Sequence, residues 1–243
     1  MAEFVRAHHR AVSRVLQALN GTLLERAECY FGGGTQLALA FCEYRESRDV
    51  DFLVSRPAGY RLLREQVTSN SLGQILTHAL PLAREVRADR DGIRTFFAID
   101  DIKVKFEILL EARIALEGAM DPLLSVPVLA RQHAIAEKLL ANADRGLDVA
   151  TQSRDLVDLA FVAAHVPPAE LVQGLAIAQV AYGDAVSRQL AMALEEFRAR
   201  PAHARRCIET LGIVDKATLR KGLRALARLA TQSGKARSIT PPP

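Results

Sequence analysis

The chain has 243 residues, 49% of them hydrophobic and 25% charged, which is the profile of a soluble globular protein of one large domain or two small ones. No apolar run approaches the roughly 20 residues that cross a bilayer, and the polar N-terminus lacks the apolar core of a signal peptide, so we expect a cytoplasmic protein without a membrane partner. The net charge of +4 permits an anionic partner such as RNA or a nucleotide without requiring one.

The first part of the chain predicts helices and strands in alternation. Apolar residues at helical spacing predict an amphipathic helix over residues 4–19. A short strand is expected at residues 29–31, and it runs into three glycines that precede a helical pattern at 35–41. The sequence DVDFLV at residues 49–54 alternates and then becomes apolar, which indicates a strand with one polar face at its start.

The rest of the chain predicts more strands and then helices only. Residues 58–68 are expected to be helical, and strands are expected at 84–88, 93–99 and 102–110 because turn-forming residues separate them. From about residue 127 the helical periodicity continues to the end. Strands followed by helices predict an α+β protein with a small mixed sheet, flanking helices and a C-terminal helical half.

The domain organisation follows from this change of pattern. The seam is expected near residues 112–127. We predict an α/β core over residues 1–115, a helical domain over 116–235 and a disordered tail over 236–243.

The cysteines and histidines indicate neither a disulfide framework nor a zinc site. Cys29, Cys42 and Cys207 form no CxxC or Cys/His pattern, so we interpret them as buried thiols. The six histidines have no spacing comparable to HExxH, and we interpret most of them as surface or packing residues.

Asp49 and Asp51 are candidate metal ligands. Alternate residues of a strand point to one face, so the two carboxylates would project together while Val50 and Phe52 face the core. Neighbouring carboxylates repel each other and are best tolerated around a cation, and their oxygen atoms select magnesium or manganese. Taken alone, this short pattern more often marks two surface acids at a solvated strand end.

The glycine run in FGGGTQLAL, residues 31–39, is a candidate phosphate-binding turn. Glycines let the backbone approach a phosphate closely, and the start of a helix offers unpaired N–H groups and a positive dipole. Thr35 would add a hydroxyl donor. Without its neighbours, this segment fits a tight strand-to-helix turn that binds nothing.

A third carboxylate lies on a later strand. In IKVKFEIL, residues 102–109, the apolar residues share one face while Lys103, Lys105 and Glu107 share the other. Glu107 is available beside the aspartates if this strand neighbours residues 49–54. Without the other motifs, these polar residues fit the exposed face of an edge strand.

Several spaced segments resemble one family. FGGGTQLALAFCEYRESRDVDFLV resembles the first motif of the AbiEii/AbiGii toxin family of nucleotidyltransferases, a Gly-Gly-Thr helix start followed by Arg, Ser and Asp-hydrophobic-Asp-Phe. IKVKFEIL is similar to the family's later strand, with Glu107 in the acid position. EKLLANADRGLDVATQSRDLVDLAF resembles the helical half, with Lys138 and Asp155 in the lysine and aspartate positions. The resemblance covers roughly residues 28–162.

The resemblance implies a nucleotidyltransferase-like fold and a role for each matching residue. The expected nucleotide-binding residues are Gly33, Gly34, Thr35, Arg45, Ser47 and Lys138, of which the first three would cradle the triphosphate. Asp49 and Asp51, with Glu107, would hold the divalent metal ion. Lys138 would contact the phosphates, and Asp155 would orient or deprotonate the acceptor hydroxyl.

Two departures leave residue assignments open. The loop CEYRESR is longer than is usual before the aspartate pair, so Arg45 and Arg48 compete for the family's arginine position. Asp158 lies one helical turn from Asp155, so these two aspartates could exchange roles.

The function implied by the resemblance is transfer of a nucleoside monophosphate from an NTP, with Mg²⁺ or Mn²⁺, to a hydroxyl of RNA, such as a tRNA end. The protein would be the toxin of a toxin–antitoxin pair, and its antitoxin need not contact it directly. One alternative keeps this chemistry with a small molecule, such as an antibiotic, or a protein as acceptor. Another is a non-catalytic RNA-binding module of the same fold.

A basic segment bears on the choice of acceptor. Leucines in residues 216–230 form an apolar stripe, and basic residues largely fill the remaining positions: Lys216, Arg220, Lys221, Arg224 and Arg228. The simpler interpretation is a docked terminal helix with a solvated basic face. The alternative is a contact with the RNA backbone, which needs positive charge and no base-specific motif.

Overall fold

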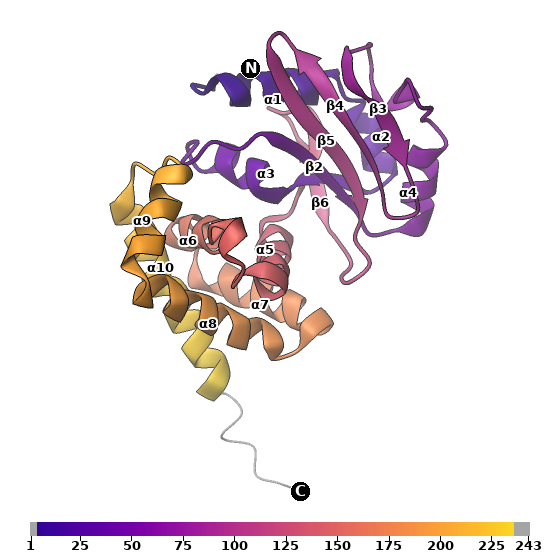
Figure 1. Ribbon diagram of the computed structural model, residues 1–243. Helices are drawn as coiled ribbons and strands as arrows, with labels where there is room; N and C mark the ends of the chain where they lie inside the picture. Colours follow the sequence, from indigo (N-terminus) through magenta and orange to yellow (C-terminus); the bar gives the residue numbers. More distant parts are fainter. Residues whose placement is uncertain (1–3, 236–243) are drawn as a thin grey trace, which may run out of the picture. The chain divides into compact units, whose positions relative to one another are not determined.

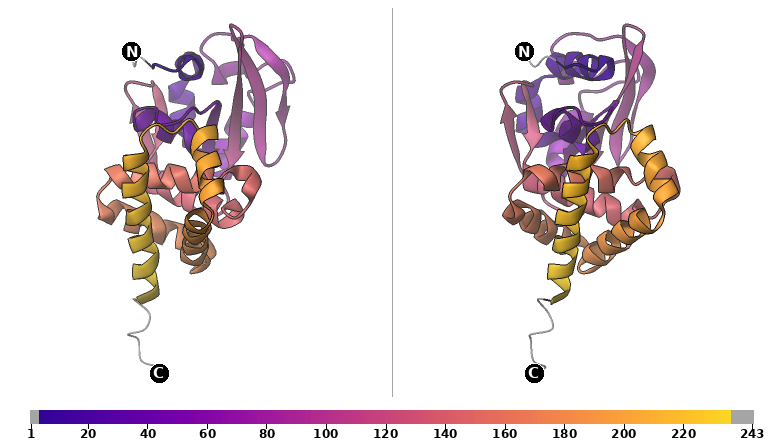
Figure 2. Two further views of the ribbon diagram at one scale, coloured as in Figure 1. Left: turned by 60° about the vertical axis from the view of Figure 1, so that its left-hand side comes forward. Right: turned by 90° about the vertical axis from the view of Figure 1, so that its left-hand side faces the viewer.

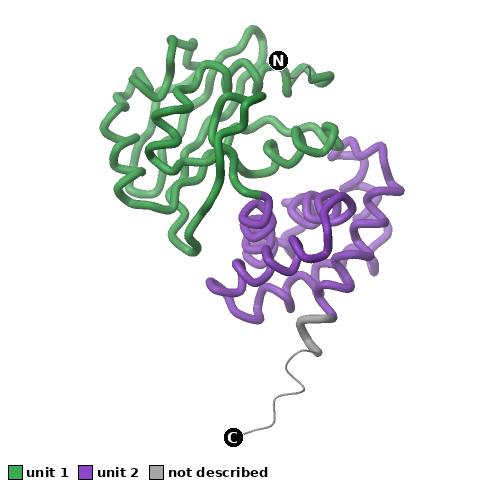
Figure 3. The backbone as a smooth tube through the Cα atoms, turned by 180° about the vertical axis from the view of Figure 1, so that it is seen from behind, with its two compact units in different colours: residues 1–130 green, residues 131–243 purple. Residues whose placement is uncertain are grey.

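The computed structural model describes residues 4–235 and divides into two compact units. Unit 1 comprises residues 1–130 and unit 2 residues 131–243 (Figure 3). This division differs from the predicted boundary after residue 115, because two short strands after that position pair into the sheet of unit 1. The tail predicted to be disordered, 236–243, lies outside the described residues.

The sheet of unit 1 is mixed, with seven strands in the described part of the chain, in the order β3-β4-β5-β2-β1-β7-β6 (Figure 1). Two pairs, β2 with β5 and β1 with β7, are parallel, and the others are antiparallel. The strand bounds are β1 Cys29–Gly32, β2 Asp49–Val54, β3 Leu82–Ala88, β4 Gly92–Ile99, β5 Ile102–Leu110, β6 Gly118–Asp121 and β7 Val126–Leu129. The predicted α+β class with a small mixed sheet is confirmed.

Helices cover the apolar face of this sheet. The segments that pack there are α1 (Ala7–Ala18), α2 (Gly21–Arg26), α4 (Pro57–Arg64) and the short η1 (Gly73–Ile75). In the centre of this core the rings of Phe31, Phe52, Phe106 and Phe97 form a chain, with neighbouring centroids 5.5–6.1 Å apart. Burial of these rings fixes which residues of β2 and β5 face inward, and so which face away.

The glycine run connects strand to helix without a loop. β1 ends at Gly32, and α3 (Gly33–Ala40) starts at the next residue. Gly33 has φ +71°, a conformation that glycine adopts without steric cost. The residues from Phe41 to Arg48 then lead to β2, and Cys42 is exposed there in a left-handed conformation with φ +57°. The prediction that all three cysteines are buried is wrong at this position, whereas Cys29 and Cys207 are buried.

Unit 2 is helical throughout its described residues. Its segments are α5 Arg131–Arg145, η2 Val149–Thr151, α6 Arg154–His165, α7 Pro168–Tyr182, α8 Ala185–Ala199, α9 Pro201–Thr210 and α10 Lys216–Lys235. Proline occupies the first position of α7 and of α9, where its missing N–H costs no helical bond. The long helix α10, yellow in Figure 2, packs against α6 and α8.

Four elements of unit 1 had no counterpart in the sequence prediction: α2, η1, β6 and β7. The sequence predicts helix from about residue 127, but residues 126–129 form β7, which pairs with β1 and β6. No helix among residues 4–235 combines the length and the apolar character needed to cross a membrane.

Candidate active site

The glycine turn and the first aspartate strand meet at one point in unit 1. Because β1 and β2 are antiparallel, Gly32 lies opposite Asp51 in the ladder. A Cβ atom added to Gly33 would lie 2.6 Å from Oδ2 and 3.1 Å from Cβ of Asp51. The carboxylate of Asp51 therefore rests against the first residue of α3, in space that only a glycine leaves open.

Asp49 and Asp51 lie on the same face of β2. Val50 and Phe52, between and after them, are fully buried in the core, whereas both aspartates are partly exposed. Alternation along the strand therefore turns both carboxylates to the face opposite the helices α1, α2 and α4. Two carboxylates beside a glycine turn are a donor set that suits a hard divalent cation.

Glu107 is the register partner of Asp51 in the parallel pair of β2 and β5, so the structure brings these two acids side by side. The carboxylate of Glu107 is bound by two cations, Arg94 Nε at 3.3 Å and the Nζ of Lys105. Among the described residues, no group of three or more His, Cys, Asp or Glu side chains could hold a metal ion. This arrangement differs from the predicted site of three carboxylates, because Arg94, on the neighbouring strand β4, supplies a positive charge that the motif alone does not reveal.

Thr35 and Ser47 connect the glycine turn to the start of β2. The hydroxyl of Thr35 donates a hydrogen bond of 2.7 Å to Oγ of Ser47, and both residues are buried. The sequence predicted that Thr35 offers this hydroxyl to a phosphate, but in the structure the group is used inside the protein. Because the Ser47 hydroxyl accepts in this bond, its own hydrogen can be donated to another group.

The two arginines that compete for one family position have different environments. Arg45 is buried, lies over the ring of Tyr44 at 6.0 Å and donates to the carbonyl of Glu46. The side chain of Arg48 is 67% exposed and forms an ion pair with Glu46 at 2.7 Å. Arg45 is therefore the arginine that the fold holds in a defined position.

His9 belongs to the same cluster, although sequence reasoning gave it no role. It is fully buried, and its ring accepts a hydrogen bond from the backbone N–H of Ser47 at 3.0 Å. The available signal was its place on the apolar stripe of α1, three residues before Val12 and seven before Leu16.

The other two predicted catalytic residues form a buried ion-pair cluster in unit 2. Nζ of Lys138 on α5 lies 2.9 Å from carboxylate oxygens of both Asp155 and Asp158 on α6. Asp155 also accepts hydrogen bonds from Arg145, at 2.7 Å from Nε and 3.1 Å from a terminal nitrogen. Lys138 thus contacts both aspartates, and Asp155 is held by Arg145 as well.

The charge state of Asp155 follows from these contacts. Burial acts to raise the pKa of this carboxyl, but Lys138 and Arg145 outweigh it and hold the pKa below its usual value. Asp155 is therefore ionised near neutral pH, and it is a weaker proton acceptor than an isolated carboxylate.

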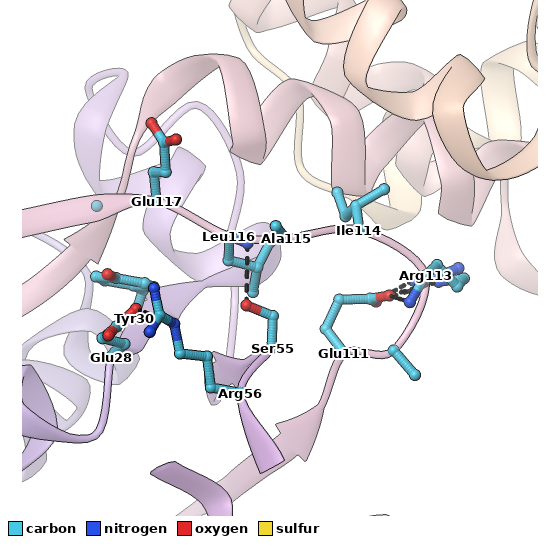
Figure 4. Close-up of a pocket in the computed structure, with 12 residues that line it drawn as sticks. Glu28, Tyr30, Ser55, Arg56, Glu111, Arg113, Ile114, Ala115, Leu116 and Glu117 are labelled. Atoms are coloured by element: carbon cyan, nitrogen blue, oxygen red, sulfur yellow. Dashed lines mark hydrogen bonds and ion pairs between the residues drawn. The ribbon is translucent and has the colours of Figure 1, made fainter. Parts of the chain in front are cut away.

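A pocket of about 580 Å³ in unit 1 lies apart from the aspartates (Figure 4). Its lining includes the ion pair of Arg56 with Glu28, and the pair of Arg113 with Glu111. Ser55, which also lines it, follows the C-terminal end of β2, four residues and roughly 13 Å along the chain from Asp51. The pocket therefore belongs to the other end of the strand.

Comparisons with known proteins identify a family and proteins of similar fold. A family model described as "Nucleotidyl transferase AbiEii toxin, Type IV TA system" matches residues 14–228. The fold resembles that of a candidate nucleotidyltransferase from H. pylori, with a TM-score of 0.56, 16% identity and 98% of each chain covered. It also resembles JHP933 from Helicobacter pylori, with a TM-score of 0.53, 16% identity, and 95% of this chain and 93% of that chain covered. No curated protein matches the chain.

Proposed function

The chain belongs to the family of AbiEii nucleotidyl transferase toxins of type IV toxin–antitoxin systems, and on this premise we propose that Asp49 and Asp51 hold its catalytic metal ion and that its acceptor is RNA. The protein is a nucleotidyltransferase, so its substrate is an NTP. The observation that carries the proposed site is the contact of Asp51 with the glycine turn at Gly33.

The reaction needs few groups from the protein. A hydroxyl oxygen of the acceptor forms a bond to the α-phosphorus of the NTP, the bond from that phosphorus to the bridging oxygen breaks, and pyrophosphate leaves with the acceptor proton released to solvent or a base. A bound Mg²⁺ or Mn²⁺ would neutralise negative charge on the phosphates. Asp49 and Asp51 are the residues that would hold it.

The backbone around Gly33 and Gly34 is the proposed phosphate contact. The start of α3 presents unpaired N–H groups, and glycine leaves room for close approach. We assign Thr35 an indirect part, because its hydroxyl is bonded to that of Ser47. We assign to Ser47 and Arg45 the direct contacts with the nucleotide that the family motif predicts. Glu107 serves, in this proposal, to hold Arg94 and Lys105 in place on the same face of the sheet.

In unit 2 we propose that Lys138 offsets phosphate charge and that Asp155 orients the acceptor hydroxyl. The low pKa of Asp155 favours orientation over deprotonation, because an acid that releases its proton readily accepts one poorly. Asp155 is held by Arg145 as well as by Lys138 and occupies the aspartate position of the family motif, so we assign the acceptor role to it.

A row of cations on α10 supports RNA as the acceptor. Lys216, Arg220, Arg224 and Arg228 are spaced four residues apart and are exposed, and none forms an ion pair with another described side chain. Residues at this spacing lie on one side of a helix, with a rise of about 6 Å per step. By contrast, Arg198 on α8 pairs with Glu195, and Arg200, the residue after α8, pairs with Glu196. A row of unpaired positive charge suits a phosphate backbone.

Labelled NTPs, Mg²⁺ and total RNA test the reaction. We expect label to move to RNA with wild-type protein and not with Asp51→Asn, which keeps the size of the side chain and removes its charge. Label on a small molecule or on protein would replace RNA as the acceptor. Equal transfer by Asp51→Asn would contradict the proposed site while leaving the enzyme class intact.

RNA binding tests the row on α10 separately. The variant Arg224→Gln/Arg228→Gln should bind tRNA more weakly, and the slope of log affinity against log salt should fall by roughly one for each lost phosphate contact. The matched control is Arg61→Gln/Arg64→Gln, two exposed arginines of α4. Equal effects of both pairs would show that only net charge matters and would remove α10 from the proposal.

A further inference from the structure

His9 lies in a position that its sequence neighbourhood does not suggest. The adjacent His8 has a partly exposed side chain, whereas His9 has none of its surface exposed. Its ring points from α1 toward the segment between α3 and β2, where it meets Glu43 and Ser47. These contacts join residue 9 to positions 34 and 38 residues later in the chain.

The two ring nitrogens of His9 have different partners, which fixes the tautomer. A backbone N–H only donates, so Nε2, 3.0 Å from the nitrogen of Ser47, must be the unprotonated acceptor. Nδ1 then carries the hydrogen and donates to Oε1 of Glu43 at 2.7 Å. The ring is thus neutral, and it acts as a bridge from a carboxylate to a main-chain amide.

Glu43 is itself held firmly. Its carboxylate accepts the backbone N–H groups of Val5 at 2.8 Å and Arg6 at 3.1 Å, and its own carbonyl accepts from Nε of Arg6 at 3.1 Å. Burial acts to raise the pKa of Glu43, but these hydrogen bonds and His9 outweigh it and lower the pKa. His9 therefore receives its orientation from an ionised carboxylate that the start of the chain fixes in place.

Ser47 transmits this orientation to both parts of the candidate site. Its N–H is bound by His9, and its hydroxyl accepts from Thr35, two residues after Gly33. Two residues after Ser47 comes Asp49, the first residue of β2. The bonds from Glu43 through His9 and Ser47 to Thr35 thus form one chain that ends at the glycine turn and the aspartate strand.

We propose that His9 is a positioning residue for nucleotidyl transfer, holding the Ser47 main chain so that Ser47 and Asp49 are correctly placed for the nucleotide. This inference rests on the proposed site at Asp49 and Asp51. His9 touches no predicted ligand, so it acts through Ser47 alone. Small displacements of groups that bind reacting phosphates are costly, since a misplacement on the order of 1 Å lowers a rate by about 10²-fold.

Two substitutions of His9 separate its two bonds. In His9→Gln, the amide oxygen reaches the place of Nε2 and keeps an acceptor for Ser47, while the bond to Glu43 is lost. In His9→Asn, the amide nitrogen takes the place of Nδ1 and keeps the donor to Glu43, while the acceptor for Ser47 is lost. Each variant loses one buried hydrogen bond, so their stabilities should fall by similar amounts.

The experiment measures kcat, KM for NTP and melting temperature for both variants in the full chain. We expect His9→Asn to lower kcat about tenfold or more, with a smaller change in KM, and His9→Gln to recover most of that loss at a similar melting temperature. The control is His8→Asn, a change of the same type one residue away, which should leave kcat unchanged.

The outcomes distinguish the inference from its premise. If both His9 variants lose activity equally, in proportion to their melting temperatures, His9 stabilises the fold and positions nothing, and the inference is wrong. If Asp51→Asn, assayed in parallel, remains active, the proposed site itself is wrong. Loss of activity in Asp51→Asn together with unchanged kcat in His9→Asn overturns the role of His9 alone.

Discussion

Replacement of Gly33 by alanine provides a direct test of the contact between the glycine turn and Asp51. The added Cβ would lie 2.6 Å from Oδ2 of Asp51, well inside van der Waals contact, and Gly33 has φ +71°. The positive φ costs on the order of 1–3 kcal/mol with a side chain present. The clash itself adds little to this cost, because the carboxylate sits at the end of a side chain that can turn away. By turning away, however, it leaves the place where we propose that the metal ion binds.

Activity should therefore fall far more than stability. A shift on the order of 1 Å at a reacting centre corresponds to about 10²-fold, so we expect Gly33→Ala to lower kcat/KM at least that much while the protein remains folded. Gly183→Ala is the control, because Gly183 has φ +55° and its added Cβ would meet nothing within 4 Å. It should lose stability on the same order and retain its activity.

The assay is nucleotide transfer with labelled NTP, performed well below the midpoint of thermal unfolding for each variant. A folded Gly33→Ala protein with near wild-type kcat/KM would refute the reasoning, since the carboxylate of Asp51 would then not need its present position. Equal losses of activity in both glycine variants would also refute it, because they would assign the effect to backbone strain.

Three further predictions concern stability. Lys138→Met leaves two buried carboxylates without their shared cation, so we expect the free energy of unfolding to fall by about 3–5 kcal/mol and the melting temperature by roughly 6–20 °C. An unchanged melting temperature would contradict the presence of the buried ion-pair cluster. Alanine in place of a helix-interior glycine normally stabilises a protein by about 1 kcal/mol. In Gly222→Ala, however, the added Cβ would lie 1.7 Å from the carbonyl oxygen of Ala160, so we expect urea unfolding to show a loss of stability of about 3 kcal/mol or more. A gain in stability would disprove the close packing of α10 on α6. Burial lowers the pKa of His9 below its unfolded value near 6.5, although the neighbouring glutamates act to raise it. As the pH falls, the unfolded chain therefore binds a proton at His9 before the folded chain does. The stability that the neutral, buried ring contributes is complete above pH 6.5 and is lost as the pH falls toward the folded pKa. His9→Gln should show a flatter change in urea midpoint between pH 7.5 and 5.5, and an equal slope would argue against a neutral buried ring.

The charged groups around His9 set the size of that pH effect. Glu43 bonds directly to the ring and raises the pKa of His9, the charge of Arg6 lowers it, and the charge of Glu46 raises it. Burial outweighs them, which agrees with the acceptor role of Nε2 toward Ser47.

Much of the sheet could be predicted because its signals are local. Residues 49–54 and 102–110 alternate in polarity and are bounded by turn residues, and both segments form strands with those limits. The strand β7 escaped prediction because it is short and contains Pro127, and because its parallel partner β1 comes from a distant part of the chain.

The candidate site, too, could be predicted only where its residues lie close together in the sequence. Asp51 and the glycine run are recognisable as motifs, since a short sequence window contains both, and the structure brings them into contact. The partners of Glu107 are not recognisable in this way, because Arg94 reaches it from a different strand. His9 lies more than 30 residues from Ser47, so only the packing of α1 on the sheet reveals that they are bonded.

The bonds from Val5 and Arg6 to Glu43 have a practical consequence for genetics. Removing Val5 and Arg6, or replacing either by proline, which has no N–H, would leave every recognisable motif intact, yet it would loosen a link to the aspartate strand. Selections for mutants that have lost toxicity should therefore recover changes at residues 5 and 6 that reduce activity without reducing expression.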